Sequence, residues 1–136
     1  MRPVFFDTNA YAAFKRNEPA IVEIIQHAES IAFSPIVIGE LLAGFDGGTR
    51  AQKNRMELQI FLEAPRVVVY PLTLDTSPFF SQIHCSLKNK GKPIPTNDMW
   101  IAATALEHGC VVCTYDKQFS FIEGLISGST VTALFV

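Results

Sequence analysis

The chain has little of what marks several broad classes of protein. Charged residues make up only 18% of its 136 residues and hydrophobic residues make up 49%, a balance that argues against a disordered chain or a coiled coil. Its apolar runs all fall far short of the ~20 residues that cross a bilayer, and Asp7 interrupts the first run too early for a signal peptide. We therefore expect a single cytoplasmic domain over residues 1–136, without membrane association.

Cysteine is also scarce, with only Cys85, Cys110 and Cys113 present. An odd count at wide spacing argues against a disulfide framework. Cys110 and Cys113 match the C-x-x-C pattern of redox and zinc sites, but two valines lie between them in an apolar run, where cysteine usually behaves as a small buried hydrophobe. No second Cys or His pair completes a zinc site.

The chain does contain a regular alternation of short apolar runs and longer helical patterns, which is typical of a parallel sheet with crossover helices. The runs predict strands at 3–6, 31–33, 67–70, 111–114 and 131–136. The intervening patterns predict helices near 10–16, 19–29, 36–45, 49–63, 73–90, 96–107 and 117–123. We therefore predict an α/β fold of three α/β/α layers around a central parallel sheet of about five strands.

Local signals predict where two of these helices begin. Ser34 followed by Pro35 is typical of an N-cap and a first helical residue. Thr96 or Asn97 is expected to cap the helix that contains Asp98.

Four acidic residues lie where chemistry is often done. Asp7 and Asp116 each follow an apolar strand, and open parallel sheets bind ligands at the carboxyl ends of their strands. Asp98 lies in the first turn of its helix, and Glu40 lies too deep in an apolar helix for a capping box. Simpler interpretations remain open, because each Asp suits a cap or a turn and the Glu could face solvent.

If these four side chains converge, they repel one another. Two charges ~4 Å apart cost about 4 kcal/mol at an effective dielectric near 20. A divalent cation removes that cost, and oxygen-only ligands favour Mg²⁺ or Mn²⁺ over zinc. Because such an ion keeps waters that can attack phosphorus, the pattern fits metal-assisted phosphodiester hydrolysis, with these ligands and catalytic residues: Asp7, Glu40, Asp98 and Asp116.

Four segments carry more information together than any single motif does. They are Val4 to Asn9, Ser34 to Leu41, Asn97 to Ala103 and Thr114 to Phe119. In order and spacing they resemble the PIN-domain nucleases, and among these the VapC-like toxins of type II toxin–antitoxin pairs. The resemblance implies a PIN-like fold and a Mg²⁺- or Mn²⁺-dependent ribonuclease that uses the four acids named above. It also implies a homodimer, a cognate antitoxin that blocks the site, and three polar residues that orient acids or water: Thr8, Asn9 and Thr114.

One position departs from the family pattern. Many relatives carry another Asp just before Phe119, where this chain has Gln118. If that acid shares a second metal, this chain holds only one metal firmly, and Asp116 is the least secure of the four assignments.

The net charge of −2 does not favour binding of nucleic acid by bulk charge. Two basic groups are nevertheless candidates for RNA contacts. One is the loop with Lys88, Lys90 and Lys92, and the other is the helical group with Arg50, Lys53 and Arg55. Either group is also consistent with a solvated charged surface.

Two other kinds of phosphate enzyme and a non-catalytic module are the alternatives. Haloacid-dehalogenase-type phosphatases need a second Asp where this chain has Asn9. Receiver domains need paired acids near the end of the first strand and a Lys after the last strand, and the chain has neither. A PIN-like binding or scaffold module would tend to lose its acids, whereas all four are present.

Overall fold

A parallel sheet lies at the centre of the structure, a computed structural model that describes residues 2–135. Within that range the sheet has five strands in the order β3-β2-β1-β4-β5. They are β1 (Val4–Phe6), β2 (Ile31–Phe33), β3 (Val67–Val69), β4 (Val111–Cys113) and β5 (Ser127–Gly128). Neighbouring strands are all parallel, so the predicted α/β fold with a central parallel sheet is confirmed.

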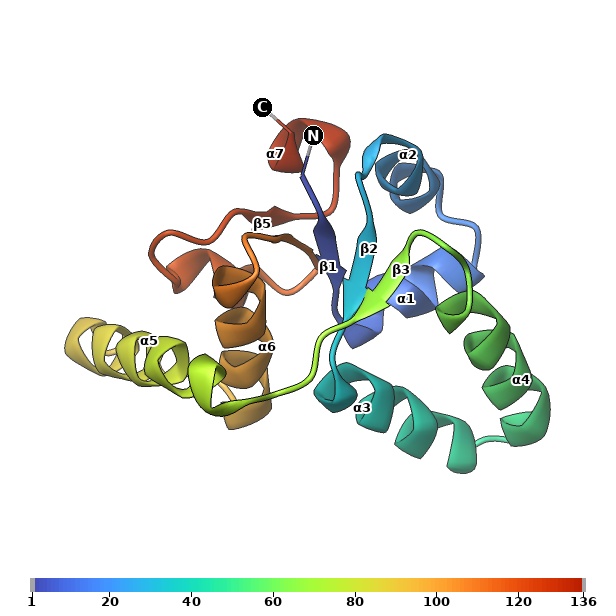
Figure 1. Cartoon of the computed structure of the whole chain (residues 1–136), viewed down its shortest axis with the longest axis horizontal. Helices are drawn as coiled ribbons and strands as arrows, with labels where there is room; N and C mark the ends of the chain where they lie inside the picture. The colour runs from blue at the N-terminus through green and yellow to red at the C-terminus, as the bar shows by residue number, and fades with distance from the viewer. Residues whose placement is uncertain (1, 136) are drawn as a thin grey trace.

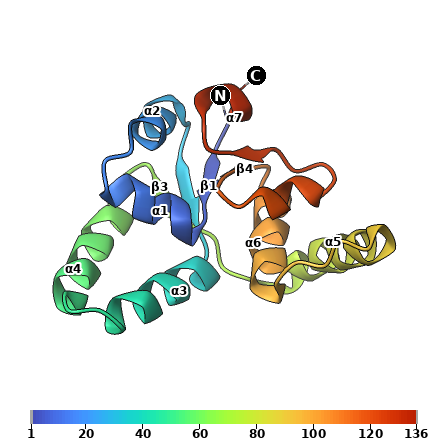
Figure 2. The same ribbon diagram turned by 180° about the vertical axis from the view of Figure 1, so that it is seen from behind.

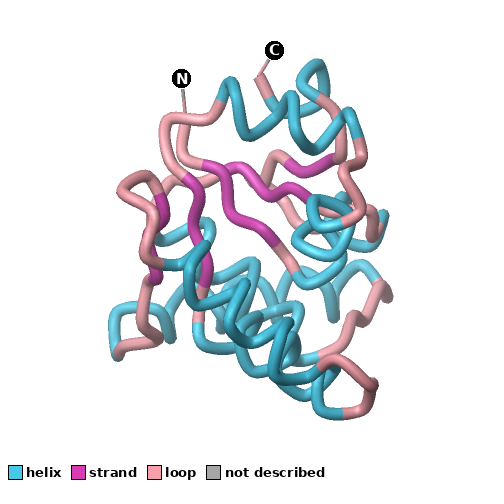
Figure 3. Tube along the Cα trace, turned by 90° about the vertical axis from the view of Figure 1, so that its right-hand side faces the viewer, coloured by secondary structure: helices cyan, strands magenta, loops and turns pink. Residues whose placement is uncertain are grey.

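Helices fill the connections and lie on both sides of β1. In Figure 1, α1, α2 and α4 lie to its right and α5 and α6 to its left, and Figure 2 shows the same separation from behind. Figure 3 shows the strands running side by side among the helices. The helices are α1 (Thr8–Lys15), α2 (Pro19–His27), α3 (Pro35–Asp46), α4 (Ala51–Leu62), α5 (Ser77–Lys90), α6 (Thr96–Glu107) and α7 (Val131–Leu134), with the 3₁₀ turns η1 (Leu74–Thr76) and η2 (Lys117–Phe121). Over residues 2–135, none of the helices has the length and apolar character needed to span a membrane.

Continuous apolar runs form the core because β1, β2 and β4 are buried along their whole length. Four aromatic rings then join α1 and α4 to β2. Tyr11, Phe14, Phe33 and Phe61 pack with centroids 5.1 to 6.3 Å apart, in three edge-to-face and two tilted pairs, and the edge-to-face arrangement is one that aromatic pairs favour. This cluster fixes α1 and α4 relative to the sheet.

The strand order places a binding crevice beside β1. The chain runs from β1 through β2 to β3 in one direction and then returns to β4 on the other side of β1. Such a reversal is where open α/β sheets bind ligands. The register pairs Phe6 with Cys113, so the next residue of each strand, Asp7 and Thr114, lie next to each other at the carboxyl edge.

The predicted last strand at 131–136 is wrong. α7 occupies this part of the chain, and the fifth strand is β5, which pairs with β4. Thr130 explains the difference, because its side chain accepts the N–H of Ala133 at 3.2 Å and starts a helix. That turn packs closely on β5, where a Cβ on Gly128 would lie 2.7 Å from Cβ of Ala133. Val136 lies outside the described residues.

The first helix begins earlier than predicted. α1 starts at Thr8 rather than near Ala10, since Oδ1 of Asp7 accepts the N–H of Ala10 and caps the helix. Ser34 lies at the N-cap of α3, as predicted, but its side chain makes no capping hydrogen bond.

The predicted cap of the helix that contains Asp98 is also wrong. The N-cap of α6 is Pro95, so Thr96 and Asn97 lie inside the helix and neither caps it. The side chain of Asn97 is engaged with another helix instead. The predicted helix at 73–90 consists of η1 followed by α5.

Candidate active site

The four predicted acids line one pocket at the carboxyl edge of the sheet. Asp7 follows β1, Asp116 follows β4, Glu40 comes from α3 and Asp98 from the first turn of α6. The pocket has a volume of about 310 Å³. Its lining consists of Asp7, Thr8, Asn9, Glu40, Pro95, Asn97, Asp98, Ile101 and Asp116.

Asp7 is the most deeply buried of these acids, with 5% of its surface exposed. Its Oδ1 accepts the Ala10 N–H at 2.9 Å, and its Oδ2 accepts the Thr114 hydroxyl at 2.5 Å. Its backbone N–H donates to the carbonyl of Cys113 at 3.3 Å. The capping interpretation and the site interpretation are therefore compatible, because one carboxylate oxygen caps α1 while the side chain still lines the pocket.

Glu40 is held by donors from two other helices. The Thr8 hydroxyl donates to its Oε1 at 2.6 Å, and the Asn97 amide donates to its Oε2. Sequence reasoning missed Asn97 as a site residue and interpreted it as a helix cap. The available signal was an amide directly before Asp98, which shares the first turn of α6.

Thr114 links the two acids that follow β1 and β4. Its hydroxyl donates to Asp7 and accepts the backbone N–H of Asp116 at 2.9 Å. Oδ1 of Asp116 in turn accepts the backbone N–H of Gln118 at 2.9 Å and caps η2. The side chain of Gln118 is not part of the pocket lining.

The pocket carries negative charge without a basic partner. None of the four acids forms a salt bridge within residues 2–135. Burial raises the pKa of Asp98 to about 6, and the charges of Asp116, Glu40 and Asp7 add to the shift. Burial also raises the pKa of Asp7, against the lowering effect of the hydrogen bonds that it accepts, and the neighbouring carboxylates raise it further.

This donor set has the chemistry of a site for a hard divalent cation. Its ligand atoms are carboxylate, amide and hydroxyl oxygens, and the lining contains neither His nor Cys. Over residues 2–135, no group of three or more His, Cys, Asp or Glu side chains is arranged to hold a metal ion by itself. A cation of the Mg²⁺ type is commonly bound by one or two carboxylates and retains several waters, so the residues fit such an ion.

The two predicted basic groups lie outside the acidic pocket and differ from each other. Lys90 donates to the carbonyl of Phe121 at 3.0 Å and pairs with Glu123 at 3.1 Å, and Lys92 lies over the Phe121 ring. In the other group, Arg55 forms a two-pronged pair with Asp46, with distances of 2.8 to 3.2 Å.

The remaining members of the helical group are Arg50 and Lys53. They make no salt bridge within the described residues and line a separate cavity.

Comparison with known sequences identifies the family. Residues 4–125 match the model of the PIN domain. VapC ribonuclease Y4jK of Sinorhizobium fredii is 34% identical, over 85% of this chain and 88% of that protein. Ribonuclease VapC2 of Rickettsia felis is 29% identical, over 77% of this chain and 78% of that protein.

Solved structures share the fold of this chain. DNA-bound VapBC from Salmonella typhimurium includes a chain with a TM-score of 0.81 and 25% identity, which covers 93% of this chain and 97% of its own length. VapBC-1 from nontypeable Haemophilus influenzae includes a chain with a TM-score of 0.80 and 24% identity, which covers 97% of this chain and 99% of its own length. The chain therefore belongs to the PIN-domain family, in the group of the VapC ribonucleases.

Proposed function

We propose that this chain hydrolyses phosphodiester bonds in RNA with the help of Mg²⁺ or Mn²⁺ and that it is the toxin of a toxin–antitoxin pair. One observation carries the proposal. Asp7, Glu40, Asp98 and Asp116 converge from four separate elements on one pocket and have no basic partner within the described residues. PIN-domain nucleases of the VapC type depend in general on a divalent metal, and the oxygen-only lining favours Mg²⁺ or Mn²⁺ over zinc.

The residues of the pocket fall into two groups: carboxylates that would bind the cation and polar residues that position these carboxylates. Two of the carboxylates of Asp7, Asp98 and Asp116 would bind the cation directly, as is usual for Mg²⁺. The third carboxylate and Glu40 would act on the cation through its coordinated waters. Asp98 is the most available ligand, because its carboxylate accepts no hydrogen bond within residues 2–135, whereas each of the other three acids accepts at least one. When bound, the cation would lower the pKa of a coordinated water and neutralise charge on the phosphate.

Three further side chains are suited to hold this arrangement. Thr8 and Asn97 fix both oxygens of Glu40, and Thr114 fixes Oδ2 of Asp7. Thr8 is the one residue with a hydroxyl among the described residues of the lining, and that hydroxyl is committed to Glu40. Attack by water rather than by a side-chain nucleophile fits this geometry. Asn9 lines the same pocket and is available to orient substrate or water.

The proposal also includes a protein partner for this chain. Three of the solved relatives are VapBC assemblies, one of them a member of the VapBC family of toxin–antitoxin systems from Mycobacterium tuberculosis. This supports a cognate antitoxin for the present chain. A homodimer and a cytoplasmic location complete the proposal.

A non-catalytic scaffold is the second candidate, and a cleavage assay separates the two. We expect single-stranded RNA to be cut when Mg²⁺ or Mn²⁺ is added and to remain intact in EDTA. Asp7→Asn should lower the rate by roughly 100-fold or more, the scale of losing a group that stabilises developing charge. Gln118→Ala, at an exposed position outside the pocket lining, is the matched control and should cut normally. Cleavage that persists in EDTA, or an Asp7→Asn variant as active as the wild type, would contradict the proposal.

A further inference from the structure

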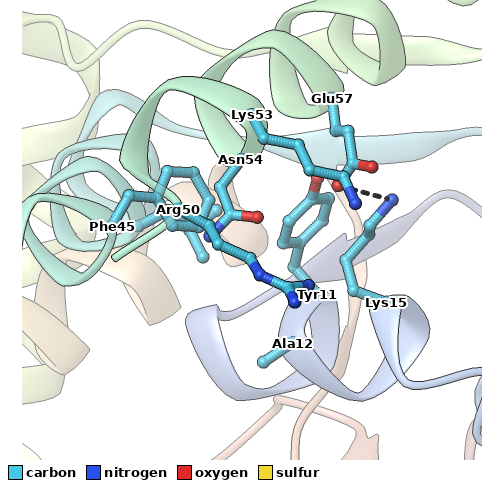
Figure 4. A pocket seen from close by; sticks show the side chains of 9 residues that line it. Tyr11, Ala12, Lys15, Phe45, Arg50, Lys53, Asn54 and Glu57 are labelled. Atoms are coloured by element: carbon cyan, nitrogen blue, oxygen red, sulfur yellow. Dashed lines mark ion pairs between the residues drawn. The ribbon is translucent and has the colours of Figure 1, made fainter. Parts of the chain in front are cut away.

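A second and larger cavity, of about 410 Å³, lies between α1, α3 and α4, outside the acidic pocket (Figure 4). We infer that this cavity is a binding subsite for the RNA backbone beside the cleaved bond, in which Lys15, Arg50 and Lys53 hold phosphate. The inference rests on the proposed function, because it concerns the path of the same substrate. The cavity falls within the ~300–1,000 Å³ range of ligand pockets.

Three basic side chains enter this cavity from two helices. Lys15 comes from the last turn of α1, whereas Arg50 and Lys53 come from the start of α4. In Figure 4 their charged ends lie around the same space. Lys15 pairs with Glu57 at 3.4 Å, but Arg50 and Lys53 have no acidic partner within residues 2–135. The cavity therefore keeps a net positive charge.

The walls of this cavity also contribute a neutral hydrogen-bond donor and the partial positive charge of a helix end. Arg50 is the N-cap of α4 and makes no side-chain capping bond, so the first N–H groups of the helix add positive potential at the same end. The amide of Asn54 lines the cavity. Burial, and then the charge of Glu57, raises the pKa of Tyr11 to about 12. Its hydroxyl therefore stays neutral and does not oppose an anion.

Two helices connect the cavity to the acidic pocket. Thr8, Ala12 and Lys15 lie at helical spacing on one face of α1, with the first lining the acidic pocket and the other two lining the cavity. From Thr8 to Lys15 the helix rises about 10 Å. On α3, Glu40 lines the pocket while its neighbour Leu41 lines the cavity. An RNA strand that leaves the acidic pocket along α1 and α3 therefore reaches the basic side chains of the cavity after a short distance.

Charge explains why a polyanion is the best occupant. The acidic pocket repels RNA, so a ribonuclease needs positive charge close to it. In the other basic group, Lys90 pairs with Glu123 and Lys92 lies over the Phe121 ring, which leaves Lys88 as the one member without such a contact in the described residues. Arg50 and Lys53 remain exposed and without an acidic partner in the described part of the chain. An acidic protein segment would satisfy the same charges, but it would not require the shared wall with the acidic pocket.

The test measures how salt affects binding of a short fluorescein-labelled single-stranded RNA, with EDTA present to prevent cleavage. Each phosphate contact on a single strand contributes about 0.7 to the slope of log affinity against log salt. The double variant Arg50→Gln/Lys53→Gln should therefore show a slope shallower by about 1.4. Between 50 and 200 mM salt, the wild type should lose roughly sevenfold more affinity than the variant.

The double variant Lys88→Gln/Lys90→Gln removes the same charge from the opposite group and is the matched control. Its slope should equal that of the wild type. Equal slope changes in the two variants, no change in either, or no RNA binding by the wild type at 50 mM salt would overturn the inference. Poly-glutamate serves as an acidic peptide probe. The inference would also be overturned if the Arg50→Gln/Lys53→Gln variant bound poly-glutamate more weakly than the wild type does but had the same salt slope for RNA.

A metal-dependent cleavage assay on the same wild-type preparation separates the two proposals. If the wild type cuts RNA and the slopes do not differ as expected, only the subsite fails. If the slopes differ as expected and the wild type cuts nothing, only the proposed hydrolysis fails.

Discussion

The acidic pocket and the basic cavity share α1 and α3 but are built in opposite ways. The pocket uses short side chains whose oxygens are fixed by hydrogen bonds, as in the pairs of Asp7 with Thr114 and of Glu40 with Thr8. The cavity uses long, exposed side chains, of which Arg50 and Lys53 form no salt bridge in the described residues.

This difference separates two tasks that a nuclease must combine. Chemistry requires ligand atoms held within a fraction of an ångström, which short and hydrogen-bonded side chains provide. Attraction of a polyanion requires only charge at the right distance, and mobile side chains supply it without a fixed geometry. We therefore expect changes in the pocket to act on kcat and changes in the cavity to act on KM.

A substitution of Asp98 in the acidic pocket should have the greatest effect on the reaction. Asp98→Asn keeps the shape of the side chain but removes the most available carboxylate. We expect kcat to fall by roughly 100- to 1,000-fold with little change in KM, because the lost interaction acts mainly on developing charge. Steady-state cleavage of an RNA substrate measures both constants. If Asp98→Asn raised KM and left kcat unchanged, Asp98 would act in substrate binding. That result would contradict the proposal that the pocket acts on kcat and the cavity on KM.

A smaller effect concerns the repulsion within the pocket. The pKa of Asp98 in the native state, about 6, exceeds its ordinary value of 3.8, so between these pH values the native state binds more protons than the unfolded state. Without divalent metal, stability should therefore fall as pH rises from about 4 to about 6. For this half-buried group we expect a loss of about 1 kcal/mol after solvent screening.

Asp98→Asn should remove this part of the pH dependence. Urea unfolding in EDTA at a series of pH values measures it, with Gln118→Ala as the control. An identical pH dependence in wild type and Asp98→Asn would show that the carboxylates do not repel one another as the geometry indicates.

The least change is expected from variants that test what keeps the acidic pocket rigid. Thr114 and Ser34 are both buried hydroxyls directly after strands, but Thr114 bonds to Asp7 and Asp116, whereas Oγ of Ser34 has no partner within residues 2–135. Thr114→Val should destabilise the fold by about 1–2 kcal/mol, and Ser34→Ala should change stability by less than about 0.5 kcal/mol. Urea unfolding of both variants tests the pair. Equal losses would mean that the hydroxyl bonds to Asp7 and Asp116 do not organise the pocket.

Much of the fold was predictable because its pattern is local. β1, β2 and β4 are continuous apolar runs, as expected for strands buried on both faces. β5 was missed because Ser127–Gly128 has no apolar pattern and becomes a strand only by pairing with β4. The apolar residues after Thr130 suggested a strand there, but the Thr130 cap makes them a helix.

The candidate site divides in the same way. The positions of Asp7, Asp98 and Asp116 at strand or helix ends were visible in the sequence, since each follows or begins a recognisable pattern. The role of Asn97 was not visible, because its bond to Glu40 joins residues 57 positions apart. Nothing within α6 alone distinguishes that amide from a helix cap.

The sequence by itself determined the buried strands β1, β2 and β4 and the positions of Asp7, Asp98 and Asp116 at the ends of elements, because apolar periodicity acts over a few neighbouring residues. Only the tertiary structure decided that these acids share one pocket and that Arg50 and Lys53 line one cavity without an acidic partner within residues 2–135, whereas Lys90 pairs with Glu123 and Lys92 lies over the Phe121 ring. The physical reason is that strand order, register and helix packing bring together groups far apart in the chain, and local preferences carry no information about such contacts.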